Sequence, residues 1–122
     1  MSKLILVVED QEDNRRILRD LLGANGFRTI EALNGPEGVK MATAQQPDLI
    51  LMDIQLPEMD GYDTTRQIRA QPHLADVPII AVTSYALSGD DVKAYEAGCN
   101  AYISKPFSPR VLLKVVQEYL SQ

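Results

Sequence analysis

Charged and hydroxylic side chains stand directly after apolar segments at several points of the 122-residue sequence. They are Glu9, Asp10, Asp53, Thr83 and Lys105. A carboxylate at the end of a buried strand costs free energy unless a cation meets it there. Carboxylates that meet at one place also raise one another's pKa, and a hard divalent cation with oxygen ligands, such as Mg²⁺, removes that repulsion.

Asp53 is the member of this set that can act as a nucleophile toward phosphorus. Its carboxylate would form an acyl phosphate by in-line attack, with the phosphoryl oxygens held by the metal, the ammonium of Lys105 and the hydroxyl of Thr83. Each residue also has an ordinary explanation when it is considered alone: a helix cap, the end of a strand, or a turn with its lysine in solvent. The chemical interpretation therefore depends on whether one edge of one sheet carries all five side chains.

The apolar segments predict such a sheet. Runs over residues 4–8, 49–52 and 77–82 are typical of strands covered on both faces, and the mixed or shorter runs over 27–32 and 101–103 are typical of edge strands. Helical patterns follow each run, so strand and helix alternate five times. Right-handed helical crossovers then give an α/β fold: a flavodoxin-like, doubly wound (βα)5 sheet of five parallel strands in the order 2-1-3-4-5, in three layers α/β/α.

Capping residues and apolar spacing predict the helix ends and their buried faces. We expect Asp13 to cap the first helix, Gly26 to end it, and a pair of Ser88 with Asp91 to cap the fourth. Side chains that repeat every three or four residues should face the sheet. On the first helix these are Ile17, Leu18, Leu21 and Leu22; on the fourth, Val92 and Tyr95; on the fifth, Leu112, Leu113, Val116, Tyr119 and Leu120.

Composition limits the setting and the partners. The formal net charge of −5 argues against a general binder of nucleic acid or of anionic membranes. Cys99 is the only cysteine, so no internal disulfide can form, which fits a reducing compartment. The apolar runs are too short to span a membrane, and the start has no signal peptide. We expect one domain over residues 1–122, located in the cytoplasm.

The order and spacing of these residues carry a family resemblance. The sequence resembles the receiver domain of bacterial two-component response regulators over essentially its whole length. The matching residues are Glu9-Asp10, the segment MDIQLPEMDG over 52–61, Thr83 and Lys105-Pro106. By this resemblance, the chain accepts a phosphoryl group on its strand-end aspartate from the phosphohistidine of a sensor histidine kinase or a histidine phosphotransfer protein.

The resemblance also implies a role for each residue. Mg²⁺ would be held by Glu9, Asp10, Asp53 and the backbone carbonyl of Gln55. Thr83 and Lys105 would bind the phosphoryl oxygens, and Tyr102 would be an aromatic switch. Drawing Thr83 inward would let Tyr102 rotate and change the outer face of the fourth helix, fifth strand and fifth helix. The family commonly has a cis peptide before Pro106. Glu9 stands where the family commonly has Asp, and its longer side chain can still reach the metal directly or through water.

We expect the output to be contact with a downstream protein, because no DNA-binding or catalytic domain accompanies the receiver. The chain would then be a monomer or a weak, phosphorylation-dependent dimer. The segments DIQLPE and YISKP are similar to those of the DivK type of single-domain receiver, which acts on histidine kinases in cell-cycle control. Regulation of a chemotaxis-type motor and a phosphorelay-intermediate role remain open. Gln55 and Tyr85 flank the site and would shade the phosphoryl group, so we expect a phosphorylated state that is not especially short-lived.

Other classes of function are separable from this one. A small Mg²⁺-dependent aspartate phosphatase would use Asp53 as its nucleophile, but such enzymes usually carry a second acid two residues later, where this chain has Gln55. A flavin or nucleotide carrier needs a phosphate-binding loop, and the acidic residues 9–13 would repel its anionic cofactor. A degenerate receiver lacks one of the site residues, and this chain lacks none. His73 is expected at the surface.

Overall fold

The structure is a computed structural model that describes residues 2–83 and 90–121. Within these residues it contains a parallel sheet in the order β2-β1-β3-β4-β5, surrounded by helices, which confirms the expected flavodoxin-like fold. The strands are β1 (Leu4–Val8), β2 (Arg28–Ala32), β3 (Leu49–Asp53), β4 (Ile79–Thr83) and β5 (Ala101–Ser104). The helices are α1 (Glu12–Ala24), α2 (Gly35–Gln45), α3 (Gly61–Arg69), the short 3-10 helix η1 (Pro72–Leu74), α4 (Asp90–Ala97) and α5 (Pro109–Leu120).

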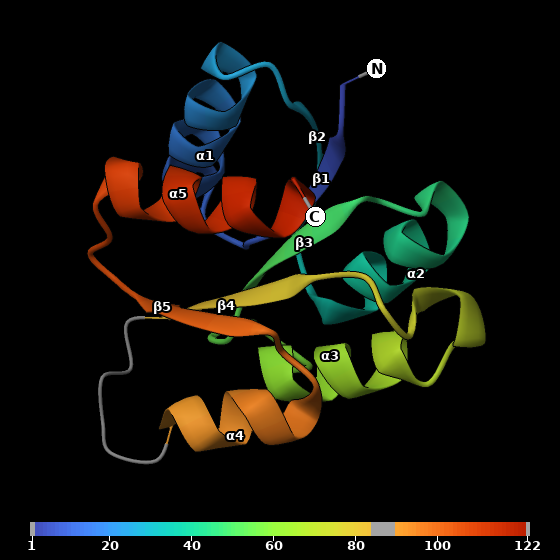
Figure 1. The fold of residues 1–122 in the computed structure, drawn as a ribbon. Helices are drawn as coiled ribbons and strands as arrows, with labels where there is room; N and C mark the ends of the chain where they lie inside the picture. Colours follow the sequence, from blue (N-terminus) through green and yellow to red (C-terminus); the bar gives the residue numbers. More distant parts are fainter. Residues whose placement is uncertain (1, 84–89, 122) are drawn as a thin grey trace.

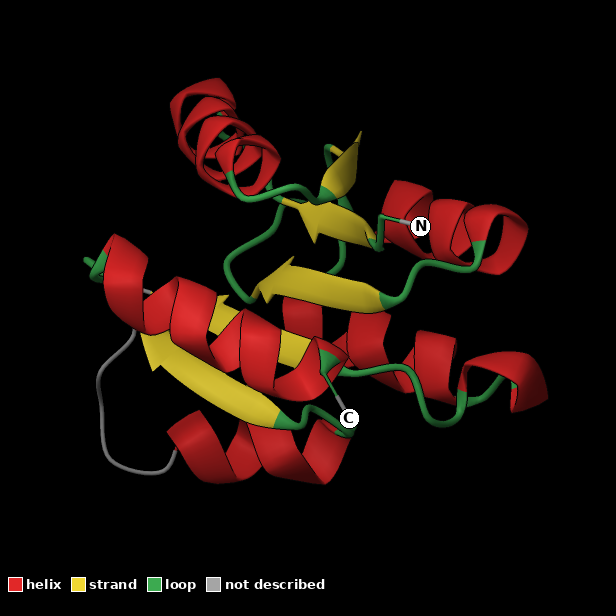
Figure 2. Cartoon of the chain, turned by 45° about the horizontal axis from the view of Figure 1, so that its top comes forward, coloured by secondary structure: helices red, strands yellow, loops and turns green. Residues whose placement is uncertain are grey.

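Helices cover both faces of the sheet, with α1 and α5 on one face and α2, α3 and α4 on the other (Figures 1 and 2). Successive strand side chains point to opposite faces, so neighbours such as Leu51 and Met52 enter different cores. Leu51 packs in the core that includes Leu18 and Leu112, whereas Met52 packs in the core that includes Ile68. Both faces are therefore buried, as the apolar runs predict. No helix in the described part of the chain is long and apolar enough to cross a membrane.

The strand register aligns the carboxyl ends of the central strands. Val8, the last residue of β1, pairs with Met52, so the residue after β1 lies beside Asp53. Asp53 in turn pairs with Val82, one residue before Thr83. The sheet thus brings the expected chemical groups to one edge.

Side-chain caps fix two of the helix starts near that edge. Asn34 Oδ1 accepts a hydrogen bond from the Glu37 N–H at 2.9 Å at the start of α2. Asp60 Oδ1 accepts one from the Asp63 N–H at 2.9 Å at the start of α3. Gly26 follows α1 with a φ of 87°, which confirms its predicted left-handed conformation.

The start and the buried face of α1 differ from expectation. The helix begins at Glu12 with Gln11 as its N-cap, so the prediction of Asp13 as the cap is wrong. The reason is that the Gln11 carbonyl already accepts the first helical hydrogen bond, from the Arg15 N–H at 3.0 Å, which places Asp13 inside the first turn. Ile17 is 50% exposed, so its expected burial is also wrong. The side chain turns instead toward a surface hollow that Lys105 also lines.

The buried face of α4 consists of small side chains. Val92 and Tyr95 are about half exposed, so their expected burial is wrong, while Ala94 and Ala97 face the core. Alanines allow α4 to lie close to α3 and β5, and the larger apolar side chains are left on the outer surface. The expected Ser88 capping pair falls on side chains outside the described part of the chain.

Candidate functional site

Four charged side chains meet at the carboxyl edge of the sheet. Carboxylate oxygens of Glu9, Asp10 and Asp53 all lie within 4.8 Å of one another. The Lys105 Nζ lies 2.9 Å from Glu9 Oε1 and 3.5 Å from Asp53 Oδ2. These residues come from the ends of three different strands, and the structure brings them together as the sequence analysis expects.

Asp53 is the last residue of β3 and is 5% exposed. Its Oδ1 accepts a hydrogen bond from the Gln55 N–H at 3.0 Å, which fixes one oxygen of the carboxylate. The chain then turns back, and the Gly61 N–H donates to the Ile54 carbonyl at 3.0 Å. Gly61 approaches so closely that a Cβ there would lie 2.5 Å from the Asp53 carbonyl oxygen. The start of α3 therefore packs directly against the backbone that carries the aspartate.

Glu9 follows β1 and is 1% exposed. Its Oε2 accepts from the Gln11 N–H at 3.0 Å, while Oε1 accepts from Lys105. Its backbone is held as well, because its N–H donates to the Ala32 carbonyl at 3.0 Å and its carbonyl accepts from Arg15 Nη1 at 2.9 Å. The sequence analysis did not identify Arg15. In the sequence, Arg15 is visible only as an arginine six residues after Glu9 in a predicted helix, and this pattern by itself does not indicate a role at the site.

Lys105 follows β5 in a backbone turn that contacts β4. Its N–H donates to the Thr83 carbonyl at 2.6 Å, and the peptide bond to Pro106 is cis. The ammonium is directed at Glu9 and Asp53. The binding of phosphoryl oxygens by Lys105 stays a prediction, and so does the metal contact of the Gln55 carbonyl.

Thr83 and Tyr102 lie on adjacent strands. Thr83 is the last residue of β4 and is fully buried. Tyr102 pairs with Ala81 on β4 and packs, partly buried, against the core of the α2, α3 and α4 face. The expectation for Tyr85 concerns a residue outside the described part of the chain. His73, in η1, is exposed as expected.

The site holds more negative charge than one ammonium compensates. Burial raises the pKa of the Asp53 carboxyl to about 7, and the charge of Glu9 adds to the rise, although Lys105 and the Gln55 N–H lower it. Burial also acts to raise the pKa of Glu9, but hydrogen bonds from the Gln11 N–H and Lys105 outweigh it and hold this pKa below its ordinary value. Burial lowers the pKa of Lys105, and its carboxylate partners raise it above the ordinary value. Lys105 therefore compensates Glu9 but not Asp53 as well.

The donor set fits a hard divalent cation. All the candidate ligand atoms are oxygens, which Mg²⁺ prefers. A second positive charge would offset the burial and the charge of Glu9, which together raise the pKa of Asp53. Both oxygens of Glu9 already accept one hydrogen bond each, and each has a second lone pair to offer. Asp10 is only partly buried, so the site opens toward water at that residue.

The sequence is similar to that of known proteins over almost its whole length. Residues 5–117 match the response regulator receiver domain. The polar-differentiation response regulator DivK of Brucella anthropi is 43% identical over 120 residues, which is 98% of each chain, and DivK of Brucella ovis is 42% identical over the same length.

Solved structures agree with the sequence relatives. The receiver domain of a sensor histidine kinase from Pseudomonas aeruginosa, which has a magnesium ion coordinated in its active-site cleft, superposes with a TM-score of 0.93 at 39% identity over all of both chains. The chemotaxis response regulator CheY4 of Vibrio cholerae gives a TM-score of 0.93 at 26% identity over 98% of this chain and all of that one. The chain therefore belongs to the family of response regulator receiver domains.

Proposed function

We propose that this chain is a phospho-accepting signalling switch of a two-component system or phosphorelay, and that Asp53 is its phosphoacceptor. The observation that carries the proposal is the cluster at the carboxyl edge, where Glu9, Asp10 and Asp53 lie within 4.8 Å of one another and Lys105 contacts two of them. Buried and partly buried groups of both signs converge there on the aspartate that ends β3. This arrangement suits charge neutralisation around a transferred phosphoryl group.

The proposed reaction moves a phosphoryl group from a phosphohistidine donor to Asp53. An Asp53 carboxylate oxygen attacks the phosphorus in line, the P–N bond to the donor imidazole breaks, and its electron pair returns to the imidazole nitrogen, which then takes a proton. The products are an aspartyl phosphate and neutral histidine. The N–H of Gln55 holds the other carboxylate oxygen of Asp53 at 3.0 Å, so the carboxylate is oriented before the donor arrives.

The surrounding residues bind and orient the group. Mg²⁺, held by the carboxylates of Glu9, Asp10 and Asp53 and by the Gln55 carbonyl, would supply positive charge for the phosphoryl oxygens. Lys105 would exchange part of its contact with Glu9 for a phosphoryl oxygen, and the Thr83 hydroxyl would bind another. Since Thr83 pairs along the sheet with the strand that carries Tyr102, its movement toward the phosphoryl group is the step that would alter β5.

The output surface in this proposal is the face formed by α4, β5 and α5. Three of its apolar side chains are about half exposed: Val92 and Tyr95 on α4, and Val111 on α5. Such a surface suits a downstream protein partner, with the chain itself a monomer or a weak, phosphorylation-dependent dimer. Because relatives 42–43% identical are polar-differentiation response regulators, we extend the proposal to regulation of kinases in cell-cycle control. We place this signalling in the cytoplasm, where a single free cysteine stays reduced.

The decisive experiment is incubation with a small phosphodonor, acetyl phosphate, with and without Mg²⁺, followed by intact-mass measurement. The wild type should gain one phosphoryl group only with Mg²⁺, and Asp53→Asn should gain none. Asp13→Asn is the matched control, since Asp13 lies in the first turn of the neighbouring helix and its side chain is 86% exposed. An equal gain on wild type and Asp53→Asn would refute the assignment.

We also propose that the domain is a phosphoacceptor that catalyses only its own phosphorylation and dephosphorylation. The position two residues after Asp53 is Gln55, which cannot protonate a leaving group as an acid does. Acetyl phosphate should therefore be consumed only as fast as the aspartyl phosphate hydrolyses and is formed again. Sustained hydrolysis of a simple ester such as p-nitrophenyl phosphate, abolished by Asp53→Asn, would instead indicate a phosphatase.

A further inference from the structure

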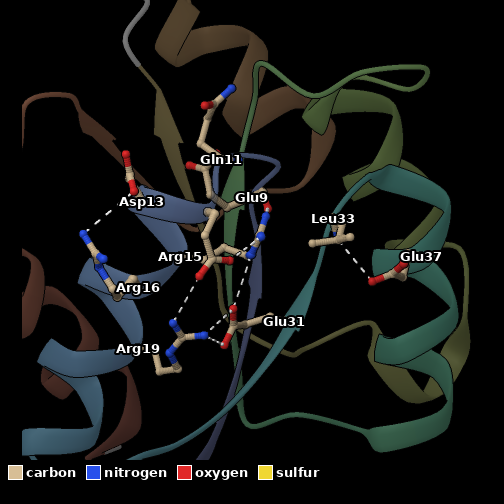
Figure 3. A network of polar contacts seen from close by, with 10 residues as sticks. Glu9, Gln11, Asp13, Arg15, Arg16, Arg19, Glu31, Leu33 and Glu37 are labelled. Atoms are coloured by element: carbon tan, nitrogen blue, oxygen red, sulfur yellow. Dashed lines mark hydrogen bonds and ion pairs between the residues drawn. The ribbon is translucent and has the colours of Figure 1, made fainter.

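A largely buried guanidinium contacts the main chain of the proposed metal-ligand pair. Arg15, on α1, donates from Nη1 to the Glu9 carbonyl oxygen at 2.9 Å (Figure 3). Its side chain is 11% exposed. Because this contact is to the backbone and not to a carboxylate, Arg15 stands outside the set of groups that would touch the metal or the phosphoryl group.

The guanidinium is itself fixed from two further directions. Arg15 Nη2 donates to Glu12 Oε2 at 2.6 Å, and Nε lies 3.4 Å from Glu31 Oε1 on β2. Arg19, one turn along α1, holds the same Glu31 carboxylate with Nη1 at 3.2 and 3.0 Å from its two oxygens (Figure 3). The planar fork of arginine suits this arrangement, since a lysine ammonium has no rigid set of donors that could face three acceptors on separate segments.

The Glu9 carbonyl lies one peptide beyond the hydrogen bond that the Glu9 N–H donates to the Ala32 carbonyl of β2. The ladder of β1 ends at Val8, which pairs with Ala32 on one side and Met52 on the other. The peptide that follows joins Glu9 to Asp10 and is planar, so the direction of its carbonyl also fixes the direction in which Asp10 leaves. Holding that carbonyl thus constrains the backbone of both acids, with Glu9 almost fully buried.

We propose that Arg15 is a positioning residue for the Glu9 and Asp10 carboxylates: it sets the plane of the peptide between them, so that both acids are oriented before a divalent cation binds. This inference rests on the proposed function, because it concerns the same Mg²⁺ site. Groups that orient metal ligands in this way typically change metal affinity when they are removed.

The test compares two variants at this position with two controls on the same helix. Arg15→Met removes the donors but keeps much of the side-chain length, and Arg15→Lys keeps the charge. Arg16→Met is the charge-matched control, since Arg16 is 62% exposed and lies 3.8 Å from its partner Asp13. Arg19→Met is the control for general loss of pairing between α1 and β2, because Arg19 contacts Glu31 but not Glu9.

The first readout is the Mg²⁺ dissociation constant from calorimetric titration. Arg15→Met should raise it about tenfold, as for other residues that orient metal ligands, and Arg15→Lys should raise it by at least about threefold. Both controls should stay within about twofold of wild type, because the exposed Arg16–Asp13 pair contributes little and Arg19 pairs with Glu12 and Glu31 and not with the Glu9 carbonyl. If Arg15→Met does not fold, Arg15→Lys decides the question by the same criterion.

The second readout needs no metal. The Gln11 N–H donates to Glu9 Oε2 at 3.0 Å, so its hydrogen exchange in EDTA reports the local order of this loop. After correction for global stability from urea unfolding, exchange at Gln11 should be faster in Arg15→Met than in either control. Acetyl phosphate kinetics should show a higher half-saturating Mg²⁺ concentration but nearly the wild-type rate at saturation, as expected of a positioning residue.

Several results would overturn the inference. Unchanged Mg²⁺ affinity in Arg15→Met or in a folded Arg15→Lys would show that the residue serves stability alone. An equal loss of affinity in Arg19→Met would assign the effect to the contact between α1 and β2 in general. Failure of the wild type to bind Mg²⁺ or to accept a phosphoryl group would refute the proposed function instead, which is a separate outcome from these.

Discussion

The ammonium nitrogen of Lys105 lies 2.9 Å from Glu9 Oε1, although 96 positions separate the two residues in the chain. The Glu9 side chain is 2% exposed and that of Lys105 is 19% exposed, so this pair is shielded from water. The same ammonium also lies 3.5 Å from Asp53 Oδ2. Removing it would leave two buried carboxylates facing each other without a counter-charge, which costs more than the loss of a surface pair.

Lys105→Met should therefore destabilise the protein by about 3 kcal/mol in EDTA, as expected when one partner of a buried ion pair is removed. Saturating Mg²⁺ should recover part of this loss, because a bound cation replaces the missing charge and ligand binding adds to the free energy of unfolding. Urea unfolding with EDTA and with Mg²⁺ measures both effects. Phosphorylation by acetyl phosphate should slow as well, since no ammonium remains to face the phosphoryl group.

The matched control is Lys114→Met, because Lys114 is exposed on α5. It should leave the free energy of unfolding within about 0.5 kcal/mol of wild type, as is usual for surface substitutions. A Lys105→Met loss no larger than that of the control would show that the Lys105–Glu9 pair contributes little in the metal-free protein.

Gly61→Ala tests the close approach between the start of α3 and Asp53. A Cβ at Gly61 would lie 2.5 Å from the Asp53 carbonyl oxygen and 2.7 Å from Ile54 Cα, both of them backbone atoms that cannot move aside alone. The substitution should cost about 2 kcal/mol through overpacking, and it should slow phosphorylation because the backbone of Asp53 shifts. Urea unfolding and the rate of mass gain with acetyl phosphate measure the two effects.

Gly23→Ala provides the opposite case. Gly23 lies inside α1, and a Cβ there would meet nothing within 4 Å. This substitution should stabilise the protein by about 0.5 kcal/mol or more through helix propensity and should leave phosphorylation unchanged. Equal effects of the two substitutions would mean that the contact at Gly61 is not what restricts that position.

Thr83→Ala tests the link between the site and Tyr102. Beryllofluoride with Mg²⁺ serves as a stable analogue of the phosphoryl group, and the ring resonances of Tyr102 report its surroundings by NMR. In the wild type the analogue should shift these resonances; in Thr83→Ala it should still bind but leave them nearly unchanged, because no hydroxyl is drawn toward it. Thr65→Ala is the control, since Thr65 is also fully buried but contacts Cys99, on the side of α3. If the Tyr102 shift is lost in both variants, its loss in Thr83→Ala reflects a general loss of packing and not the missing hydroxyl.

Those parts of the fold that follow from apolar runs and strand order could be predicted from the sequence. Continuous apolar segments identify β1, β3 and β4 as covered on both faces, and right-handed parallel crossovers leave few orders for the sheet. Once the order is known, the ends of those strands must meet at one edge. The proximity of Glu9, Asp53 and Lys105 is a consequence of topology, and it needs no knowledge of side-chain packing.

The failures concern faces and contacts that hydrophobicity alone does not determine. On α4, the larger apolar side chains Val92 and Tyr95 lie outside, and Ala94 lies inside, because the space beside α3 and β5 admits only small residues. Ile17 is exposed for a similar reason, since it borders the loop after β5 and not the sheet. Arg15 was missed because its partner is a backbone carbonyl, which no residue type in the sequence marks.

Arg69→Met tests how the opposite edge of the sheet is held together. The Arg69 guanidinium joins the end of α3 to the end of η1 and to the turn between α4 and β5. Its acceptors are the carbonyls of Leu74, Ala75 and Gly98, at 3.0, 3.2 and 2.9 Å, and Asn100 Oδ1 at 2.7 Å. Because Asn100 Oδ1 also accepts from the Ile79 N–H at 2.9 Å, the same network reaches the start of β4.

Loss of these charge-assisted hydrogen bonds should cost about 3 kcal/mol in urea unfolding, chiefly because the partly buried contacts to the Leu74 and Gly98 carbonyls are lost. Arg66→Met is the matched control on the same helix, because Arg66 is 57% exposed and pairs with the exposed Asp63 at 2.6 Å. It should cost about 0.5 kcal/mol or less. Hydrogen exchange at Ile79 should quicken in the Arg69 variant alone. If it does not, β4 is anchored by its strand neighbours, and the arginine holds only the turn that carries Gly98.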